Sequence, residues 1–334
     1  MSLVDDKISA GLHSVLHHAK ENQLKYKYRT GKALHVIFRY LFLVGLSFVM
    51  LFPIIFMLSG AFKAASDTYD MSVIWIPKNF STEAFKIAWD ALDFTSALAK
   101  TLLILIPSVF LQVLTCVLSA YGFARFRFPL KKILFTIMLF SIIVPTSSII
   151  IPLYTGFQEF NVLGISGLFG FKPNLLDTTM PFYVMAAVGF GIRSGLYIFI
   201  LRQFFRAIPK ELEEASMIDG AGTFQTFMRV MLPNAVTAIV TVAVLSVVWY
   251  WNDYYISSML MNSDFPLSVQ LTMLNSRLLT LKSGTAEMSS VSMYLLKDSI
   301  VECGCLLVSF PLIAIFVFFQ RYFTESIEKT GIVG

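Results

Sequence analysis

The feature that most constrains this chain is a series of long, continuously apolar stretches. A helix that spans a membrane needs about 20 mostly apolar residues, and six stretches reach that length. They lie at 34–61, 97–123, 131–152, 179–205, 234–260 and 301–323. Apolar and polar residues do not alternate along them as they would in the strands of a membrane barrel. We therefore predict an all-α membrane protein with six transmembrane helices.

The overall composition favours the same environment. Only 14% of the 334 residues are charged, whereas about 25% is usual for a soluble domain. A chain of this length could form a large core, but it lacks the polar side chains to cover one in water. Cys116, Cys303 and Cys305 lie in or beside apolar stretches and fit neither a zinc site nor a disulfide framework. We expect them to be packing residues.

The distribution of Lys and Arg predicts the orientation of the chain. With the N-terminus in the cytoplasm, the cytoplasmic segments hold 17 of these residues and the outer loops hold seven. Both termini are therefore predicted to be cytoplasmic. The predicted parts are a cytoplasmic amphipathic segment at 1–33, a transmembrane domain at 34–323 and a cytoplasmic tail at 324–334.

The N-terminal segment has two interpretations. Val4, Ile8 and Leu12 recur at helical spacing, as in a helix that lies on the membrane surface. His13, His17 and His18 lie on or near this face and could instead form a metal site. We favour the amphipathic helix and predict no metal site, because no carboxylate or Cys cluster accompanies the histidines.

A polar segment at 208–233 interrupts the apolar pattern between the fourth and fifth predicted spans. Pro209 suits the first turn of a helix, and Lys210 to Ile218 is predicted to be that helix. Gly220 can end it in a left-handed conformation, and Asp219 is the predicted N-cap of the next helix. This second short helix is predicted from Thr223 to Met231, with Phe224, Phe227 and Met228 on one side.

The spacing within this segment resembles the EAA loop of ABC importer permeases. The matching residues are Glu214, Ala215, Ser216, Gly220, Val230, Leu232 and Pro233. Ser216 stands where the family has a second alanine, and its small side chain should still pack. The stretches LRQFFRAIPKELEEA (201–215), WND (251–253) and AYGFARFRF (120–128) are similar to the MalG-like branch, which imports carbohydrates.

This resemblance implies a MetI-like, type I ABC importer fold and a role as a transport subunit rather than an enzyme. The loop would be a coupling helix that docks into a cleft of an ATPase subunit, where Glu214 would meet a basic residue. A solvated surface acid is the alternative interpretation of Glu214. The residues implied in coupling are Glu213, Glu214, Ala215, Ser216, Asp219, Gly220, Ala221, Leu232 and Pro233.

The resemblance also implies partners and a location. The partners would be a second, MalF-like permease, two ATPase subunits and an extracytoplasmic solute-binding protein, in a bacterial or archaeal cytoplasmic membrane. ATP and Mg would bind to the ATPase subunits, and no cofactor is expected in this chain. The sequence agrees, because the P-loop pattern GxxxxGK[ST] is absent from it. No nucleic-acid partner is expected, and lipid would surround the spans.

Two groups of polar residues are candidates for the substrate path. Arg193 falls within the fourth predicted span, where a charge should face protein or a water-filled cavity. It could bind sugar hydroxyls or an acidic group. It could instead form an ion pair between helices, for example with Asp253, or be an unusually deep interfacial anchor. The other group lies within the fifth apolar stretch and comprises Trp251, Asn252, Asp253 and Tyr254. These residues could contact a sugar, or they could be an aromatic belt with a helix cap.

Three other functions compete with a carbohydrate importer. The first is an ABC importer of another solute class, and the second is a stand-alone secondary transporter. Secondary transporters often show repeated halves with interrupted helices, and the sequence shows no convincing repeat. The third is a membrane enzyme, which would need a nucleophile, metal or cofactor motif. All four histidines precede residue 36, and no such motif is present.

Overall fold

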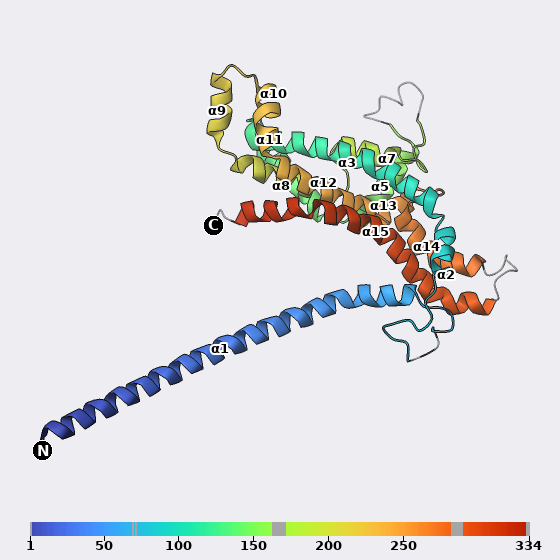
Figure 1. The fold of residues 1–334 in the computed structure, drawn as a ribbon. Helices are drawn as coiled ribbons and strands as arrows, with labels where there is room; N and C mark the ends of the chain where they lie inside the picture. Colours follow the sequence, from blue (N-terminus) through green and yellow to red (C-terminus); the bar gives the residue numbers. More distant parts are fainter. Residues whose placement is uncertain (1, 69, 71, 162–171, 282–289, 332–334) are drawn as a thin grey trace. The chain divides into compact units, whose positions relative to one another are not determined.

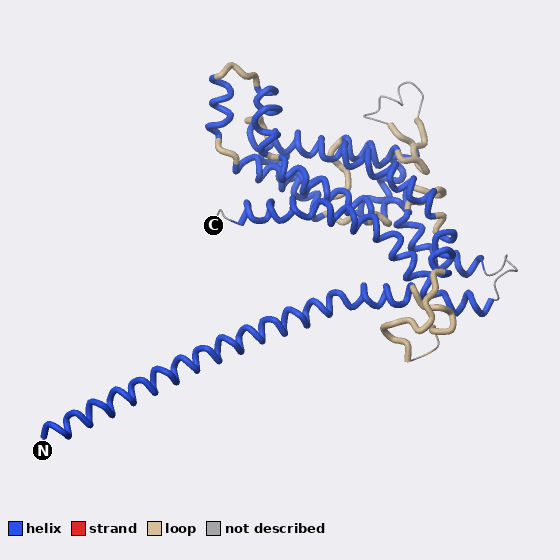
Figure 2. Tube along the Cα trace, in the orientation of Figure 1, coloured by secondary structure: helices blue, strands red, loops and turns tan. Residues whose placement is uncertain are grey.

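The computed structural model describes residues 2–331 except 69, 71, 162–171 and 282–289. Within this described part the chain is helical with connecting turns, and it contains no β-strand (Figure 2). A single antiparallel bridge joins Lys63 to Phe80. The prediction of an all-α chain is confirmed for these described residues. The chain divides into two compact units, one of residues 1–59 with 74–76 and one of 60–73 with 77–334.

The first unit consists mainly of helix α1. This helix extends from Ser2 to Ala61 without interruption and includes Pro53. The stretch Leu34–Ala61 is apolar and long enough to span a membrane, and none of its most apolar window is buried. Trp75 packs on Phe52, with ring centroids 5.3 Å apart. Residues 2–33 and the first predicted span therefore form one helix rather than two separate elements.

The second unit contains the remaining helices, which Figure 1 labels in order. They are α2 (Glu83–Ala91), α3 (Phe94–Arg125), α4 (Lys131–Ile143), α5 (Thr146–Gln158), α7 (Met180–Ala187), α8 (Ser194–Ala207), α9 (Lys210–Ile218), α10 (Thr223–Thr226), the π-helical turn η2 (Phe227–Met231), α11 (Leu232–Asn234), α12 (Val236–Trp251), α13 (Tyr255–Leu260), α14 (Leu267–Leu281) and α15 (Ser290–Gly331).

Two hydrophobic cores hold the second unit together, and α3 contributes to both. One core joins α2, the first half of α3, α7 and the helices from α12 to α15, with Trp251 and Phe182 fully buried. The other joins the second half of α3 to α8, η2 and α12, around the buried side chains of Tyr197 and Phe205. The helix α3 therefore packs along its whole length.

Three of the predicted spans are confirmed as single long helices. The helical stretches Leu34–Ala61, Phe94–Arg125 and Leu296–Gln320 are each apolar and long enough to cross a membrane. Two further pairs pass the same test only if each bent pair counts as one span. The described residues thus provide three spans, or up to five, by length and composition. The predicted tail at 324–334 continues α15 as far as Gly331.

The third predicted span, 131–152, is bent instead of straight. Helices α4 and α5 meet at an angle of 103°. Pro145 lies at the bend, and Val144 before it is extended with ψ 119°. Proline has no N–H to donate and disfavours helical geometry in the residue before it. A proline within an apolar helix usually produces a moderate kink, whereas here the two helices are bent by 103°.

The fourth predicted span, 179–205, is wrong as a single helix. Helix α7 ends at Ala187, and α8 begins at Ser194. Between them Gly189 has φ 75° and Arg193 has φ 62°, both left-handed. Two left-handed residues within five positions cannot continue a right-handed helix. We call residues 188–193 the α7–α8 break. The fifth predicted span also ends early, because α12 stops at Trp251 and a short α13 follows.

Candidate functional site

The segment that resembles an EAA loop folds into two short helices joined by a turn. Ile208 and Pro209 are extended, and α9 then runs from Lys210 to Ile218 as predicted. Glu211 and Glu213 lie in its first turn, where acidic groups favour the helix dipole. We call residues 208–233 the elbow. In Figure 1, α9 and α10 project beyond the ends of α3 and α8.

The turn of the elbow depends on Gly220, which has φ 84° as the sequence predicts. Its N–H donates to the Met217 carbonyl, and the Ala221 N–H donates to the Ser216 carbonyl. These bonds close the end of α9 in the usual left-handed manner. The predicted N-cap role of Asp219 is wrong. Asp219 is the C-cap of α9, and Gly222 precedes α10 with no side-chain cap.

A buried ion pair fastens the elbow to α3. The Arg125 Nε lies 3.3 Å from Glu213 Oε2, and the two side chains are only 7% and 12% exposed. The Tyr121 hydroxyl donates to Glu213 Oε1 at 3.0 Å. Arg125 Nη2 also donates to the Ile208 carbonyl at 2.6 Å, just before α9 begins. Glu213 is therefore engaged inside the chain.

The other side of the elbow is open. Glu214 and Ala215 are exposed, and so are Ile218 and Phe224, whose exposed fractions are 85% and 74%. Large apolar side chains with this exposure are typical of a surface that a partner covers. Ser216 is half-buried, and its hydroxyl lies 3.1 Å from that of Thr226, so a hydrogen bond joins the two arms of the elbow.

The predicted common face of Phe224, Phe227 and Met228 is wrong. Phe227 is buried and packs on Tyr121, with ring centroids 4.7 Å apart, whereas Phe224 and Met228 are exposed. At the end of the elbow Leu232 is half-buried and the exposed Pro233 lies in the first turn of α11. The elbow thus has an inner face fixed to the bundle and an outer face without a partner in the described part of the chain.

Arg193 lies in the α7–α8 break and is exposed, so it is not in the middle of a helix. Its guanidinium carbon lies 4.3 Å from the centroid of the Trp249 ring. A cation over an indole face is a favourable arrangement. The alternative of an ion pair with Asp253 is wrong, since the Asp253 carboxylate accepts hydrogen bonds from the Ser257 N–H and hydroxyl instead.

The four residues from 251 to 254 have different surroundings. Trp251 is 2% exposed, and its Nε1 donates to the Val308 carbonyl at 3.1 Å, so its ring is a packing element. Asp253 caps α13 through its bonds to Ser257. Asn252 and Tyr254 are exposed, although Asn252 Nδ2 donates to the Val248 carbonyl. Only Arg193, Asn252 and Tyr254 of the predicted substrate-path residues present exposed side chains.

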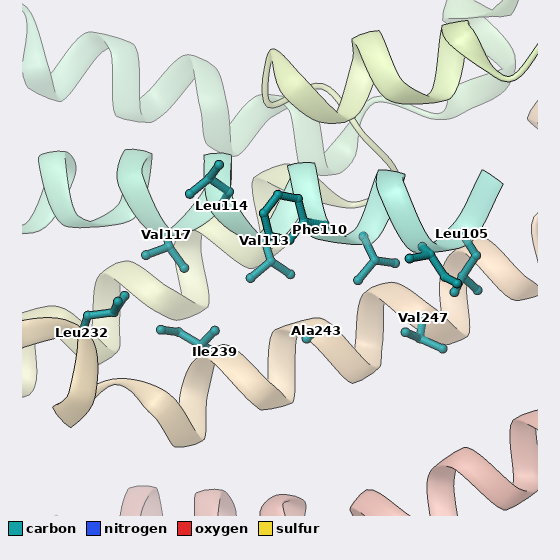
Figure 3. Close-up of a pocket in the computed structure, with 11 residues that line it drawn as sticks. Leu105, Phe110, Val113, Leu114, Val117, Leu232, Ile239, Ala243 and Val247 are labelled. Atoms are coloured by element: carbon teal, nitrogen blue, oxygen red, sulfur yellow. The ribbon is translucent and has the colours of Figure 1, made fainter. Parts of the chain in front are cut away.

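A pocket of about 490 Å³ lies between α3 and α12. Figure 3 shows Val113 and Val117 of α3 on the side that faces Ile239 of α12, and all the side chains drawn are hydrocarbon. A sugar site needs groups that hydrogen-bond to hydroxyls, and this pocket has none among its lining side chains. They are Leu105, Ile106, Val109, Phe110, Val113, Leu114, Val117, Leu232, Ile239, Ala243 and Val247.

The described residues contain no group of three or more His, Cys, Asp or Glu side chains that could hold a metal ion. The side chains of His13, His17 and His18 lie outside that described set. The three cysteines are free, and Cys116 and Cys303 are buried. Sequence reasoning missed the anchor made by Tyr121 and Arg125. Both lie in the stretch AYGFARFRF, which drew attention only through its resemblance to other permeases.

Comparison with known proteins places this geometry in a family. Residues 112–329 match the family described as "Binding-protein-dependent transport system inner membrane component", which covers more than half of the chain. A solved structure of a bacterial ABC transporter involved in the import of the acidic polysaccharide alginate has a similar fold. Its TM-score is 0.65 at 21% identity, and the match covers 87% of this chain and 96% of that one.

Several curated relatives match most of the chain. The diacetylchitobiose uptake system permease protein NgcG of Streptomyces coelicolor is 26% identical over 85% of this chain and 84% of its own. The trehalose transport system permease protein SugB of Mycobacterium tuberculosis is 26% identical over 85% and 93%. The maltodextrin transport system permease protein MdxG of Bacillus subtilis is 24% identical over 91% and 99%. The chain belongs to the family of binding-protein-dependent transport system inner membrane components.

Proposed function

We propose that this chain is one of two permease subunits of an ATP-driven importer and forms half of its translocation path. In this proposal it crosses a bacterial or archaeal cytoplasmic membrane six times, with both termini in the cytoplasm. The excess of Lys and Arg in the predicted cytoplasmic segments, one of which is the elbow, supports this orientation. The second half of the path would come from a MalF-like permease.

The observation that carries the proposal is the two-sided geometry of the elbow. Glu213 fixes α9 to α3 through Arg125 and Tyr121, while Glu214 on the same helix is exposed. A separate ATPase subunit can therefore dock on the outer face, and its movement reaches the bundle through the inner face. Two such subunits, holding ATP and Mg, would drive the change from inward-facing to outward-facing.

The proposed substrate is a carbohydrate, expected to be an oligosaccharide, that an extracytoplasmic binding protein delivers. The relatives above are permeases for diacetylchitobiose, trehalose and maltodextrin, which supports this class. The described side chains that could meet it are the Arg193–Trp249 pair, Asn252 and Tyr254, because an aromatic ring beside hydrogen-bonding groups suits a sugar. Arg193 would also suit an acidic sugar.

A charge reversal on the elbow tests the coupling role. We expect Glu214→Lys to insert normally but to recover about tenfold less ATPase when the tagged chain is purified in mild detergent, since a paired interface charge is costly to lose. Glu83→Lys is the matched control, because Glu83 is also an exposed acid in a nine-residue helix, α2. Equal ATPase recovery in both variants would contradict the assignment.

The same purification separates the competing functions. Recovery of a second permease and an ATPase, with ATP turnover raised by a sugar-loaded binding protein, is the result expected of a carbohydrate importer. If a binding protein loaded with another solute raises the ATP turnover, the transported substrate belongs to that other class and not to the carbohydrates. A wild-type chain that transports alone after gentle extraction would instead be a secondary transporter.

A further inference from the structure

Several cations gather where α3, α4 and α8 come together at the elbow end of the bundle. They are Arg127, Lys131, Arg202 and Arg206, which we call the basic cluster. Lys131 interacts repulsively with the other three, and Arg202 with Arg206. None of these four forms an ion pair among the residues that the structure describes, whereas the nearby Arg125 pairs with Glu213. The cluster therefore has an excess of positive charge at close range.

Two of the four cations are held in place by their surroundings. The Arg202 Nε donates to the Phe123 carbonyl at 3.3 Å, and its guanidinium carbon lies 3.9 Å from the centroid of the Phe135 ring. The Lys131 Nζ donates to the Phe126 carbonyl at 2.7 Å. Arg127 and Arg206 are exposed. Like charges that are fixed near one another favour binding of an anion, and arginine fits phosphate in a bidentate manner.

The basic cluster adjoins an exposed apolar surface. Leu130 is 66% exposed and Ile133 is 57% exposed, and helix α4 has no buried residue at all. Lys131 lies between these two apolar side chains in the sequence and over the Phe128 ring, 5.9 Å from its centroid. Phosphate-binding groups directly beside exposed hydrocarbon match the two parts of a phospholipid, its headgroup and its acyl chains.

We propose that the basic cluster is a binding site for the headgroup of an anionic phospholipid, with α4 in contact with the acyl chains. The mixture of cations and exposed apolar side chains favours a lipid over the acidic face of a partner protein. The polar surface of a soluble partner would leave the apolar side chains of α4 exposed to water. The proposal rests on the membrane location of the family and not on the identity of the transported solute.

The test compares two lipids that have the same acyl chains, phosphatidylglycerol and phosphatidylcholine. Native mass spectrometry of the purified transporter complex measures the apparent affinity for each. We expect the wild-type complex to bind phosphatidylglycerol more tightly. Arg127→Gln with Lys131→Gln should weaken that binding about fivefold per removed charge, or about 25-fold, and leave phosphatidylcholine unchanged.

Lys86→Gln with Lys172→Gln is the matched control, since it removes two exposed positive charges outside both the basic cluster and the elbow. This control should bind both lipids as the wild type does. A second pair, Arg206→Gln with Arg127→Gln, should reproduce the loss and guards against misfolding of one variant.

Three results would overturn the proposal. One is equal binding of the two lipids by the wild type, or an equal loss in the control. Another is displacement of phosphatidylglycerol by inorganic phosphate at the same concentration, which would make free phosphate the ligand. The third is a cluster variant that binds phosphatidylglycerol normally but loses its ATPase subunits, which would make the basic cluster a protein contact.

Discussion

The elbow and the α7–α8 break are both interruptions of the helices with a left-handed glycine, and their surroundings are opposite. In the elbow, Gly220 has φ 84°, and a Cβ added to it would meet no atom within 4 Å. In the α7–α8 break, Gly189 has φ 75°, and a Cβ added at the neighbouring Gly191 would lie 2.8 Å from both Gln112 Oε1 and the Tyr250 hydroxyl. One interruption is open and the other is closely packed.

The two interruptions therefore need glycine for different reasons. At Gly220 glycine supplies a backbone conformation, and the space around it remains free for another protein. At Gly191 glycine supplies space, because α3 and α12 approach the break from two sides, and Gln112 Nε2 donates to the Ile192 carbonyl at 2.6 Å. A partner surface and a packed joint can thus share similar local sequence signals.

The largest expected effect comes from removing the ion pair that holds the elbow to α3. We expect Glu213→Ala to destabilise the protein by about 3 kcal/mol, because it leaves the buried Arg125 charge unpaired. Glu214→Ala, next in the chain but exposed, should change stability by less than about 0.5 kcal/mol. Thermal unfolding of the purified complex measures both. Equal shifts would mean that the ion pair does not hold the elbow.

The packed joint is tested by adding one methyl group. Gly191→Ala should cost about 2 kcal/mol, since the new Cβ must push against Gln112 and Tyr250. Gly222→Ala is the control in the elbow, where a Cβ would meet nothing within 4 Å. The comparison fails if the two variants unfold at the same temperature.

A smaller effect is expected where only the backbone conformation is at stake. Gly220→Ala should cost about 1.5 kcal/mol, because a left-handed conformation is unfavourable for alanine. Gly220→Asn should recover part of this loss, since asparagine tolerates the left-handed region better. Both variants should be compared by their unfolding temperatures. A loss as large as that of Gly191→Ala would show that the turn is crowded in the assembled protein.

The smallest expected effect concerns the bond between the arms of the elbow. Ser216→Ala removes the hydrogen bond to Thr226 and should cost about 1 kcal/mol, part of it from leaving the fully buried Thr226 hydroxyl unpaired. Ser216→Ala combined with Thr226→Val should be closer to wild type. A double variant less stable than the single one would show that Thr226 has another role.

The sequence predicted those features that local residue preferences determine. The start of α9 after Pro209 and the left-handed Gly220 follow from backbone geometry, and both were predicted. Long helices without an interruption, such as α3, follow from continuous apolar character. For the same reason, the apolar stretch around Gly189 and Gly191 was predicted to be one helix, because hydrophobicity alone does not mark a change in backbone handedness.

Contacts between distant parts of the chain could not be predicted from local patterns. The partner of Glu213 is Arg125, 88 positions earlier, so the local pattern gave no reason to separate Glu213 from the exposed Glu214. The same applies to Trp251, whose bond to the Val308 carbonyl depends on how α12 packs on α15. The roles of the predicted coupling and substrate-path residues in transport remain predictions for the experiments above.

Helix α3 connects the anchor made by Tyr121 and Arg125 to the hydrophobic core at its other end. It has 32 residues and is about 48 Å long at 1.5 Å per residue. Arg125, its last residue, receives Glu213, while Phe94, its first residue, lies in the opposite core. Because α3 packs into both cores, it connects the elbow to the core at its other end. We therefore expect a displacement of the elbow to reach that core through α3.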